Sequence, residues 1–326
     1  MGLMTSGGDA PGMNAAVRAV VRCGTASGWT MLGICRGYRG LIEGDVLELD
    51  NRAVGGIIER GGTILRTARS PKFLQPSGQQ QALDVCRDFK LDGIFVIGGN
   101  GSLRGARWLS ENGIPTIGIP ASIDNDIPQT RMAIGVDSAL NTVVECLNRL
   151  RDTAVAHERA FVVEVMGRHS GYIALMSGLA GGAEIILLPE NPCSLASIGM
   201  RVREGIQKGK THSILVVAEG FTPEGIETRP NSPGQTISDY LRAHRIAETR
   251  LTILGHLQRG GSPTAFDRVL ACRFAEAAVR EFAAGHQAIM IAWTGCEMVP
   301  VSLDMLDSPC DNVEPALLEL ADTVAH

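Results

Sequence analysis

The chain has 326 residues, of which 44% are hydrophobic and 20% charged, and its net charge at pH 7 is −5. This balance is typical of a globular protein with a sizeable core, and the length is enough for two domains. No apolar run reaches the ~18 residues of a membrane span, and the negative charge does not favour nucleic-acid binding. We therefore expect a cytoplasmic protein without a secretory leader, a membrane partner or a nucleic-acid partner.

Apolar runs of strand length alternate with helical patterns along the chain, which predicts an α/β architecture. After a short apolar lead, the apolar residues of the segment 13–21 recur at helical spacing. Further strands are predicted at 94–97, 116–119, 161–166, 185–188, 214–218, 251–254 and 288–292. Long helices are predicted at 138–153 and 265–284, and a surface loop rich in Pro and Gly at 222–234. The eight cysteines form no C-x-x-C pair, which predicts reduced thiols.

Two glycine-rich turns follow predicted strands near the start of the chain. The first turn is Thr5–Gly12, and the second is Gly98–Ser102. Glycine lets the backbone approach a phosphate, and the helix that follows can direct its N–H groups at the anion. Because ligands of parallel sheets bind at the carboxyl ends of strands, we interpret both turns as phosphate-binding. Either turn alone is equally consistent with an ordinary tight connection.

Two carboxylates follow the predicted strand at 116–119. Asp124 and Asp126 are separated by Asn125, a residue that favours a turn. One such carboxylate can accept a proton while the other orients groups or binds a metal. An isolated pair would more often be turn-capping aspartates, but the two preceding glycine turns favour the catalytic interpretation.

Two later segments combine glycine with cationic side chains. Gly167 and Arg168 end the predicted strand at 161–166, and Gly255–Pro263 contains His256 and Arg259. An arginine fork can bind a phosphate through two hydrogen bonds. Both segments are therefore predicted to bind an anion.

Together these motifs resemble the phosphofructokinase family, whose members phosphorylate fructose 6-phosphate at O1. The motifs keep the family order over nearly the whole chain: Thr5–Asn14, Gly61–Thr63, Gly98–Ser102, Ile123–Asp126, Val163–Arg168 and Gly255–Pro263. The chain resembles the short bacterial ATP-dependent enzymes, because it is one unit long. The resemblance implies two Rossmann-like three-layer α/β/α domains with the active site in the cleft between them. Residues 1–136 with 252–306 would bind ATP, and 137–251 with 307–326 would bind the sugar phosphate.

The resemblance also implies roles for individual residues. Asp124 would be the base that takes the proton from the sugar hydroxyl, and the other implied catalytic residues are Ser122, Asp126, Arg69 and Arg168. The residues implied to contact ATP are Gly8, Arg69, Ser70, Gly99, Asn100, Gly101 and Ser102. Those implied to hold fructose 6-phosphate are Ser122, Ile123, Asp124, Arg159, Met166, Gly167, Arg168, Glu219, Arg250, His256, Leu257, Gln258 and Arg259. Asn100 and Asp126 would hold Mg²⁺.

A homotetramer with shared active sites is a further implication of the resemblance, with Arg159 and Arg250 reaching the sugar phosphate from a neighbouring subunit. An effector site for ADP or phosphoenolpyruvate is implied at Arg18, Arg22, Arg151, Glu184, Lys210 and His212. Arg18 and Arg22 lie one helical turn apart, and this spacing by itself favours a solvated helix face. Thr211 departs from the pattern, because relatives often have a second lysine there.

Asn100 is the main departure from the family pattern, because relatives usually have aspartate at this position. Its amide oxygen can still coordinate Mg²⁺, but loss of the negative charge is expected to weaken metal–nucleotide binding or to slow transfer. Ser122 replaces a common threonine and keeps the hydroxyl. Ser70 stands where an aromatic residue often helps to bind the nucleotide.

The phosphoryl donor is expected to be ATP. Pyrophosphate-dependent relatives carry an acidic residue at the position of Gly101 and a lysine at that of Ala121, and neither is present here. Two alternatives stay open. The chain could be a pyrophosphate-dependent enzyme, or a weakly catalytic regulatory subunit that binds sugar phosphate and effectors.

Overall fold

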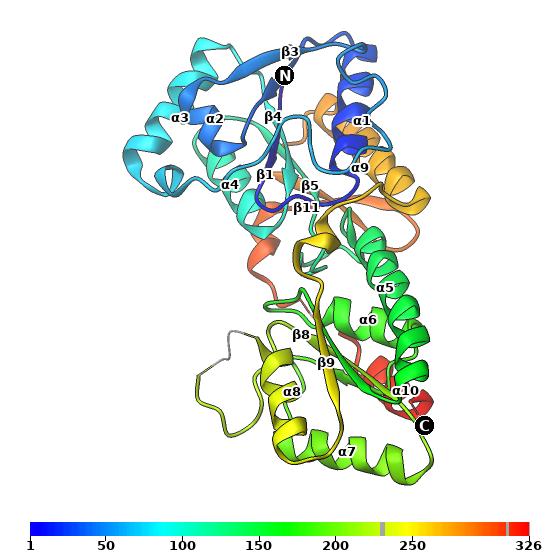
Figure 1. The fold of residues 1–326 in the computed structure, drawn as a ribbon. Helices are drawn as coiled ribbons and strands as arrows, with labels where there is room; N and C mark the ends of the chain where they lie inside the picture. Colours follow the sequence, from blue (N-terminus) through cyan, green and yellow to red (C-terminus); the bar gives the residue numbers. More distant parts are fainter. Residues whose placement is uncertain (229–231, 311–312, 326) are drawn as a thin grey trace. The chain divides into compact units, whose positions relative to one another are not determined.

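A computed structural model describes residues 1–228, 232–310 and 313–325, and divides the chain into two compact units. The first unit comprises Met1–Ser138 and Arg259–Cys310, and the second comprises Ala139–Gln258 and Asp311–His326 (Figure 1). The return to the first unit begins at Arg259 and not at residue 252, because Thr252 and Ile253 still pair with a strand of the second unit. In the described parts of the chain, no helix has the length and apolarity of a membrane span.

The first unit is built on a sheet of seven strands in the order β11-β10-β5-β4-β1-β2-β3. The strands are β1 (Gly2–Ser6), β2 (Met31–Ile34), β3 (Val46–Leu49), β4 (Ile94–Gly98), β5 (Thr116–Pro120), β10 (Ile289–Trp293) and β11 (Met298–Ser302). The five inner strands are parallel, and the two edge strands pair antiparallel with their neighbours. Every residue of β1, β4 and β5 is buried, as expected of parallel strands covered on both faces.

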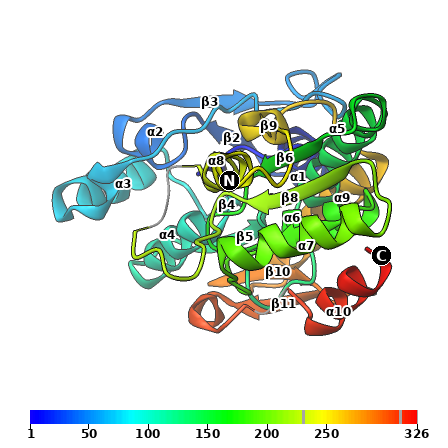
Figure 2. The same cartoon turned by 60° about the horizontal axis from the view of Figure 1, so that its bottom comes forward.

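Helices cover both faces of this sheet (Figures 1 and 2). One face carries α1 (Met13–Ala26) and α9 (Ala265–Ala283), and the other carries α2 (Tyr38–Glu43), α3 (Pro76–Asp88) and α4 (Asn100–Glu111). The apolar side of α1 is buried, which confirms the helical spacing predicted for residues 13–21. The described residues also form the short 3₁₀ segments η1 (Pro71–Leu74), η2 (Gly255–Arg259) and η3 (Leu303–Asp307).

The second unit contains a parallel sheet of four strands in the order β7-β8-β6-β9. The strands are β6 (Ala160–Val165), β7 (Ile185–Leu187), β8 (Ser213–Ala218) and β9 (Thr249–Ile253). The helices are α5 (Val136–His157), α6 (Tyr172–Ala180), α7 (Leu195–Gln207), α8 (Pro233–Ala243) and α10 (Pro315–Val324). Buried apolar side chains of α7 and α8, such as Ile198 and Ile237, form one core with Val162 and Leu215 of the sheet.

The predicted strands and long helices are present, with ends that differ by a few residues. The predicted loop at 222–234 ends earlier, because Pro233 and Gly234 open α8. Proline is favoured at the first helical position, and the Ser232 hydroxyl caps the helix by accepting a hydrogen bond from the Gln235 N–H. Positions 229–231 of that loop lie outside the described residues.

A buried carboxylate joins α9 to the start of α5 within the first unit. Asp267 is fully buried and accepts hydrogen bonds from the Gly135 N–H (2.9 Å), the Ser138 N–H (2.8 Å) and the Ser138 hydroxyl (2.6 Å). Burial raises the pKa of Asp267, while these three donors lower it. The carboxylate therefore satisfies backbone donors that no water can reach at the entry of α5.

We expect Asp267→Ala to lower the free energy of unfolding of the first unit by about 2–4 kcal/mol, because buried donors lose their acceptor. All three tryptophans of the chain, Trp29, Trp108 and Trp293, lie in this unit, so their fluorescence during urea unfolding reports on it. Glu276→Ala is the matched control on the same helix. Its exposed ion pair with Arg280 is worth at most about 1 kcal/mol. Equal urea midpoints for the two variants would contradict this role of Asp267.

Candidate active site

The carboxyl ends of three neighbouring strands bring the predicted turns together. Ser6 at the end of β1 pairs in register with Gly98 at the end of β4, and Gly98 pairs with Pro120 at the end of β5. A Cβ on Gly98 would lie 2.5 Å from the Ser6 carbonyl oxygen, so only glycine fits at this position. The first turn, the second turn and the aspartate turn therefore start at one edge of the sheet.

A cavity of about 710 Å³ opens at this edge, within the first unit. The predicted site residues that line it are Gly8, Arg69, Ser70, Gly99, Asn100, Gly101, Ser102, Ser122, Asp124, Asp126 and Arg259. Ile123 does not line the cavity and is fully buried. The cavity thus unites all the residues predicted to contact a nucleotide with the two carboxylates of the aspartate turn.

Three aromatic side chains form a wall of the cavity that the sequence did not indicate. The ring centroid of Phe73 lies 4.2 Å from that of Tyr38 and 5.5 Å from that of Trp108. The Tyr38 hydroxyl donates to the Ser102 carbonyl oxygen (2.6 Å), and burial raises the pKa of this phenol well above its usual value. Because the three residues come from η1, α2 and α4, no local motif could have linked them. Tyr38 and Phe73 are buried and Trp108 is half-buried, so Trp108 is the ring of this wall that a flat ligand ring could reach.

The aspartate turn is fixed by the residue between its two carboxylates. Asn125 has a positive φ of 48°; its amide group donates to the Arg131 carbonyl and accepts from the Ala133 N–H, both at 3.1 Å. The buried asparagine holds the backbone, while the half-buried Asp124 and Asp126 line the cavity. The Ser122 hydroxyl donates to Asp126 Oδ1 (3.1 Å) and accepts from the Asp124 N–H (3.3 Å). Ser122 therefore connects the two carboxylate residues.

Asn100 and Asp126 lie side by side and both carry side-chain oxygen atoms. Asn100 Nδ2 donates to the Asp126 main-chain oxygen (2.9 Å), and this contact fixes the orientation of the amide. Asn100 Oδ1 is buried and accepts no hydrogen bond from any residue that the structure describes. Amide and carboxylate oxygens are hard ligands of the type that Mg²⁺ prefers.

Two further arginines reach this cavity. Arg259 Nη1 donates to the Asp9 carbonyl oxygen (2.9 Å) across the first glycine turn, and a Cβ on Gly8 would lie 2.7 Å from that nitrogen. Gly8 therefore leaves the space that Arg259 needs. The second arginine is Arg104, which no motif in the sequence indicated as a site residue. Its Nε lies 3.3 Å from the carboxylate of Asp307 in η3.

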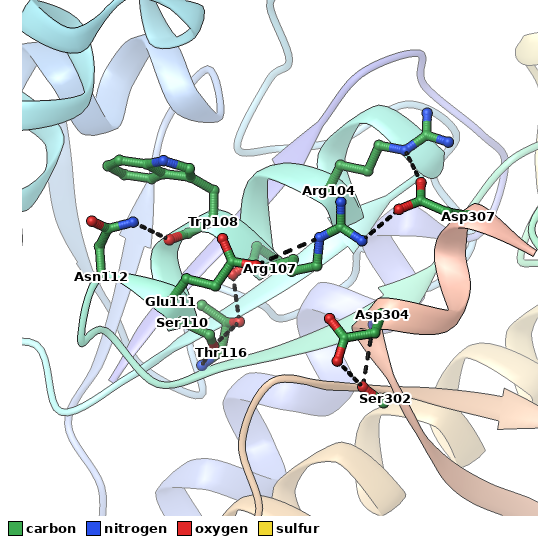
Figure 3. A network of polar contacts seen from close by, with 11 residues as sticks. Arg104, Arg107, Trp108, Ser110, Glu111, Asn112, Thr116, Ser302, Asp304 and Asp307 are labelled. Carbon is green, nitrogen blue, oxygen red and sulfur yellow. Dashed lines mark hydrogen bonds and ion pairs between the residues drawn. The ribbon is translucent and has the colours of Figure 1, made fainter.

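Asp307 also binds Arg107 (2.8 Å), one turn further along α4 (Figure 3). The hydrogen bond from Arg107 holds the pKa of the Asp307 carboxyl below its usual value. The Arg104 and Asp307 side chains are about half exposed and that of Arg107 is 25% exposed, so solvent weakens both ion pairs. Their role is positional, because they hold α4 against the returning segment.

In the second unit, several predicted sugar-phosphate residues gather at the carboxyl ends of β6 and β8. The Met166 N–H donates to Gln258 Oε1 (3.3 Å), and the Glu219 N–H donates to the Val165 carbonyl (2.8 Å). Gly167 has a φ of +133°, which favours glycine at this turn. The residues of this group with exposed side chains are Arg168, His256 and Leu257.

Arg159 and Arg250 lie at the opposite end of the same strands, near the amino-terminal ends of β6 and β9. Arg159 directly precedes β6, and Arg250 pairs with Phe161 near the start of that strand. Together with Arg242 and Arg245 they line a hollow of about 600 Å³, where Arg159 Nε contacts Glu248 at 2.9 Å. The six residues of β6 span roughly 20 Å, so these arginines do not join the group around Met166 within one chain.

The predicted effector residues are only partly brought together. Arg151 approaches Glu184 at 3.9 Å, and Glu184 shares a hollow of about 180 Å³ with Lys210, whose Nζ donates to the Ala325 carbonyl (2.5 Å). His212 is half-buried beside Thr211. The two remaining members, Arg18 and Arg22, are on α1 and belong to the first unit.

Comparisons with known proteins agree with this architecture. The family model described as phosphofructokinase matches residues 1–282. An ATP-dependent 6-phosphofructokinase of Thermotoga neapolitana is 49% identical, over 98% of this chain and 97% of that protein. The protein of the same name from Natranaerobius thermophilus is 46% identical, over 100% and 99%.

Solved structures give the same result. Phosphofructokinase of Pichia pastoris in the T-state matches 99% of this chain and 38% of its own, with a TM-score of 0.87 and 35% identity. A pyrophosphate-dependent phosphofructokinase of Marinobacter aquaeolei shares the fold, with a TM-score of 0.85 and 21% identity over 99% of this chain and 91% of its own. From its motifs, its fold and these relatives, the chain belongs to the phosphofructokinase family.

Proposed function

We propose that this protein transfers a phosphoryl group from Mg-ATP to O1 of fructose 6-phosphate, which yields fructose 1,6-bisphosphate and ADP. The observation that carries the proposal is the cavity of the first unit, which combines two glycine turns, an aromatic wall and the Asp124–Asp126 pair. The relatives named ATP-dependent 6-phosphofructokinase support the same reaction. This glycolytic reaction takes place in the cytoplasm.

Phosphoryl transfer needs little covalent chemistry from the protein, but it needs an oriented nucleophile and neutralised phosphate oxygens. In this mechanism Asp124 accepts the proton of the sugar O1 hydroxyl as the oxygen attacks the γ-phosphorus and the bond to ADP breaks. Arg69 and Arg168 neutralise the developing charge, and Ser122 and Asp126 position the transferring group. Mg²⁺, held by Asn100 and Asp126, supplies further positive charge when bound.

The geometry favours ATP over pyrophosphate as the donor. A Cβ on Gly101 would meet no atom within 4 Å, so the second turn leaves space that the α-phosphate of a nucleotide could occupy. The aromatic wall gives the cavity an apolar side with the half-buried Trp108 ring on it, where a nucleotide base can stack; pyrophosphate has no base.

A purely regulatory subunit is the less favoured alternative. A chain that only binds sugar phosphate would not need Asp124, Asp126 and Arg69 in one cavity. Regulation itself is part of our proposal, with ADP or phosphoenolpyruvate as effectors. The hollow beside Glu184 and Lys210 supports an anion-binding role for this region.

We further propose a homotetramer in which each active site includes residues of two subunits. The support is the position of Arg159 and Arg250 in the second unit. They lie near the amino-terminal ends of the strands, whereas Met166 and Glu219 lie at the carboxyl ends. A neighbouring subunit would supply this arginine pair to the sugar phosphate.

The proposed reaction is tested with purified protein, Mg²⁺ and fructose 6-phosphate in a coupled assay. We expect kcat/KM with ATP to exceed the value with pyrophosphate by at least about 100-fold, because only ATP uses the base-stacking wall and the α-phosphate space. Gly101→Asp is expected to raise the KM for ATP at least about tenfold through charge repulsion. Gly101→Ala is the matched control, since its methyl group meets open space. A preference for pyrophosphate would refute the donor assignment.

Replacement of the base tests the catalytic role of Asp124. Asp124→Ser should lower kcat by about 10²–10⁴-fold, because general-base assistance is lost, with little change in the KM for the sugar. Asp88→Asn, an exposed aspartate at the end of α3, should leave both constants unchanged. A near-native kcat for Asp124→Ser would exclude this residue as the base.

Shared active sites predict complementation between two defective variants. Asp124→Ser and Arg250→Ala are each expected to be weakly active, but random hybrids contain about one site in four with both native residues. Activity after joint refolding should therefore exceed the sum of the two variants refolded separately. Simple additivity would argue that Arg250 and Asp124 do not act at a common site formed by two subunits.

A further inference from the structure

The second turn and the aspartate turn are tied by a hydrogen bond that an aspartate could not make. The acceptor is the Asp126 main-chain carbonyl, 2.9 Å from Asn100 Nδ2. A carboxylate at position 100 would place one of its oxygens opposite this carbonyl oxygen, so two acceptors would face each other. The amide thus holds together, without a cation, two segments that a carboxylate would push apart.

The charges around the cavity favour an uncomplexed polyanion as well. The charged residues that line it are three arginines, Arg69, Arg104 and Arg259, and two aspartates, Asp124 and Asp126. The ion pair with Asp307 offsets part of the charge of Arg104. The contact of Arg259 with the Asp9 carbonyl uses one of its five N–H donors. A third carboxylate at position 100 would cancel the remaining excess of positive charge.

We propose that Asn100 makes nucleotide binding at this cavity largely independent of Mg²⁺. The inference rests on the proposed function and concerns the binding step of the same site. Asn100 Nδ2 keeps the two turns in place whether or not a metal is present, and the neutral side chain adds no repulsion toward free phosphates. Asn100 Oδ1, buried without a hydrogen-bond partner among the described residues, still offers a ligand to the metal. The metal is therefore needed for transfer and not for docking of the nucleotide.

The test is calorimetric titration of the purified protein with ADP, once in EDTA and once in excess Mg²⁺, with saturating phosphoenolpyruvate in both buffers to keep ADP out of the proposed effector site. For the native protein, the two dissociation constants should agree within about threefold. Asn100→Asp should bind ADP at least about tenfold more weakly in EDTA, and Mg²⁺ should restore the affinity, because the ion bridges the added carboxylate and the phosphates. Sugar phosphate is absent, so catalysis does not enter the measurement.

Two further variants separate the hydrogen bond from the charge. Asn100→Ala removes both the hydrogen bond and the Oδ1 ligand without adding charge, so it should weaken binding in EDTA without the recovery in Mg²⁺ that is expected of Asn100→Asp. Asn112→Asp is the matched control, because Asn112 Nδ2 donates to the Trp108 carbonyl on the same helix and away from the cavity. It should bind ADP as the native protein does.

The inference would be overturned if the native protein, like Asn100→Asp, bound ADP at least tenfold more weakly in EDTA than in Mg²⁺. It would also be overturned if the native protein bound no ADP in either buffer. An inactive protein that still binds ADP equally in both buffers would instead refute the proposed reaction and leave this inference intact.

Discussion

The parallel register of β1, β4 and β5 is the constraint on which the site depends. In the parallel ladder Ser6 lies opposite Gly98, and Gly98 lies opposite Pro120, so the three strands end at the same level of the sheet. Because β4 and β5 are buried on both faces, a slip of one residue would exchange the side chains that pack against the two helix layers and would shift the strand ends out of line. The fixed register therefore places the two glycine turns and the aspartate turn around one cavity.

Glycines and asparagines determine how the turns at these strand ends pack together. Gly98 permits the close approach of β1 to the second turn, and Gly8 leaves room for Arg259. Asn125 holds the aspartate turn from inside, whereas Asn100 ties it to the neighbouring turn. The polar groups are thus set by backbone contacts before any ligand binds, which lowers the cost of ordering them during the reaction.

The second unit is also built on parallel strands, but its predicted sugar-phosphate residues lie at both ends of these strands. Met166, Glu219 and Gln258 lie at the carboxyl ends of its parallel strands, whereas Arg159 and Arg250 lie near the amino-terminal ends. A single chain with this sheet cannot gather all the predicted anion ligands at one point. The separation follows from strand length and is the physical basis for the proposal that another subunit completes the site.

Local patterns in the sequence determined the strands, the long helices, the three turns and the aspartate pair, because burial period and turn chemistry act over a few residues. The turn Gly98–Ser102 and the pair Asp124–Asp126 could be located in this way. Only the tertiary structure decided the wall of Tyr38, Phe73 and Trp108, the crossing of Arg259 over Gly8 and the late return of the chain at Arg259. These contacts join segments that are far apart in the chain, and their residues carry no local signal. They arise when the helices pack onto the sheet, and the order of the strands in that sheet cannot be read from a single sequence.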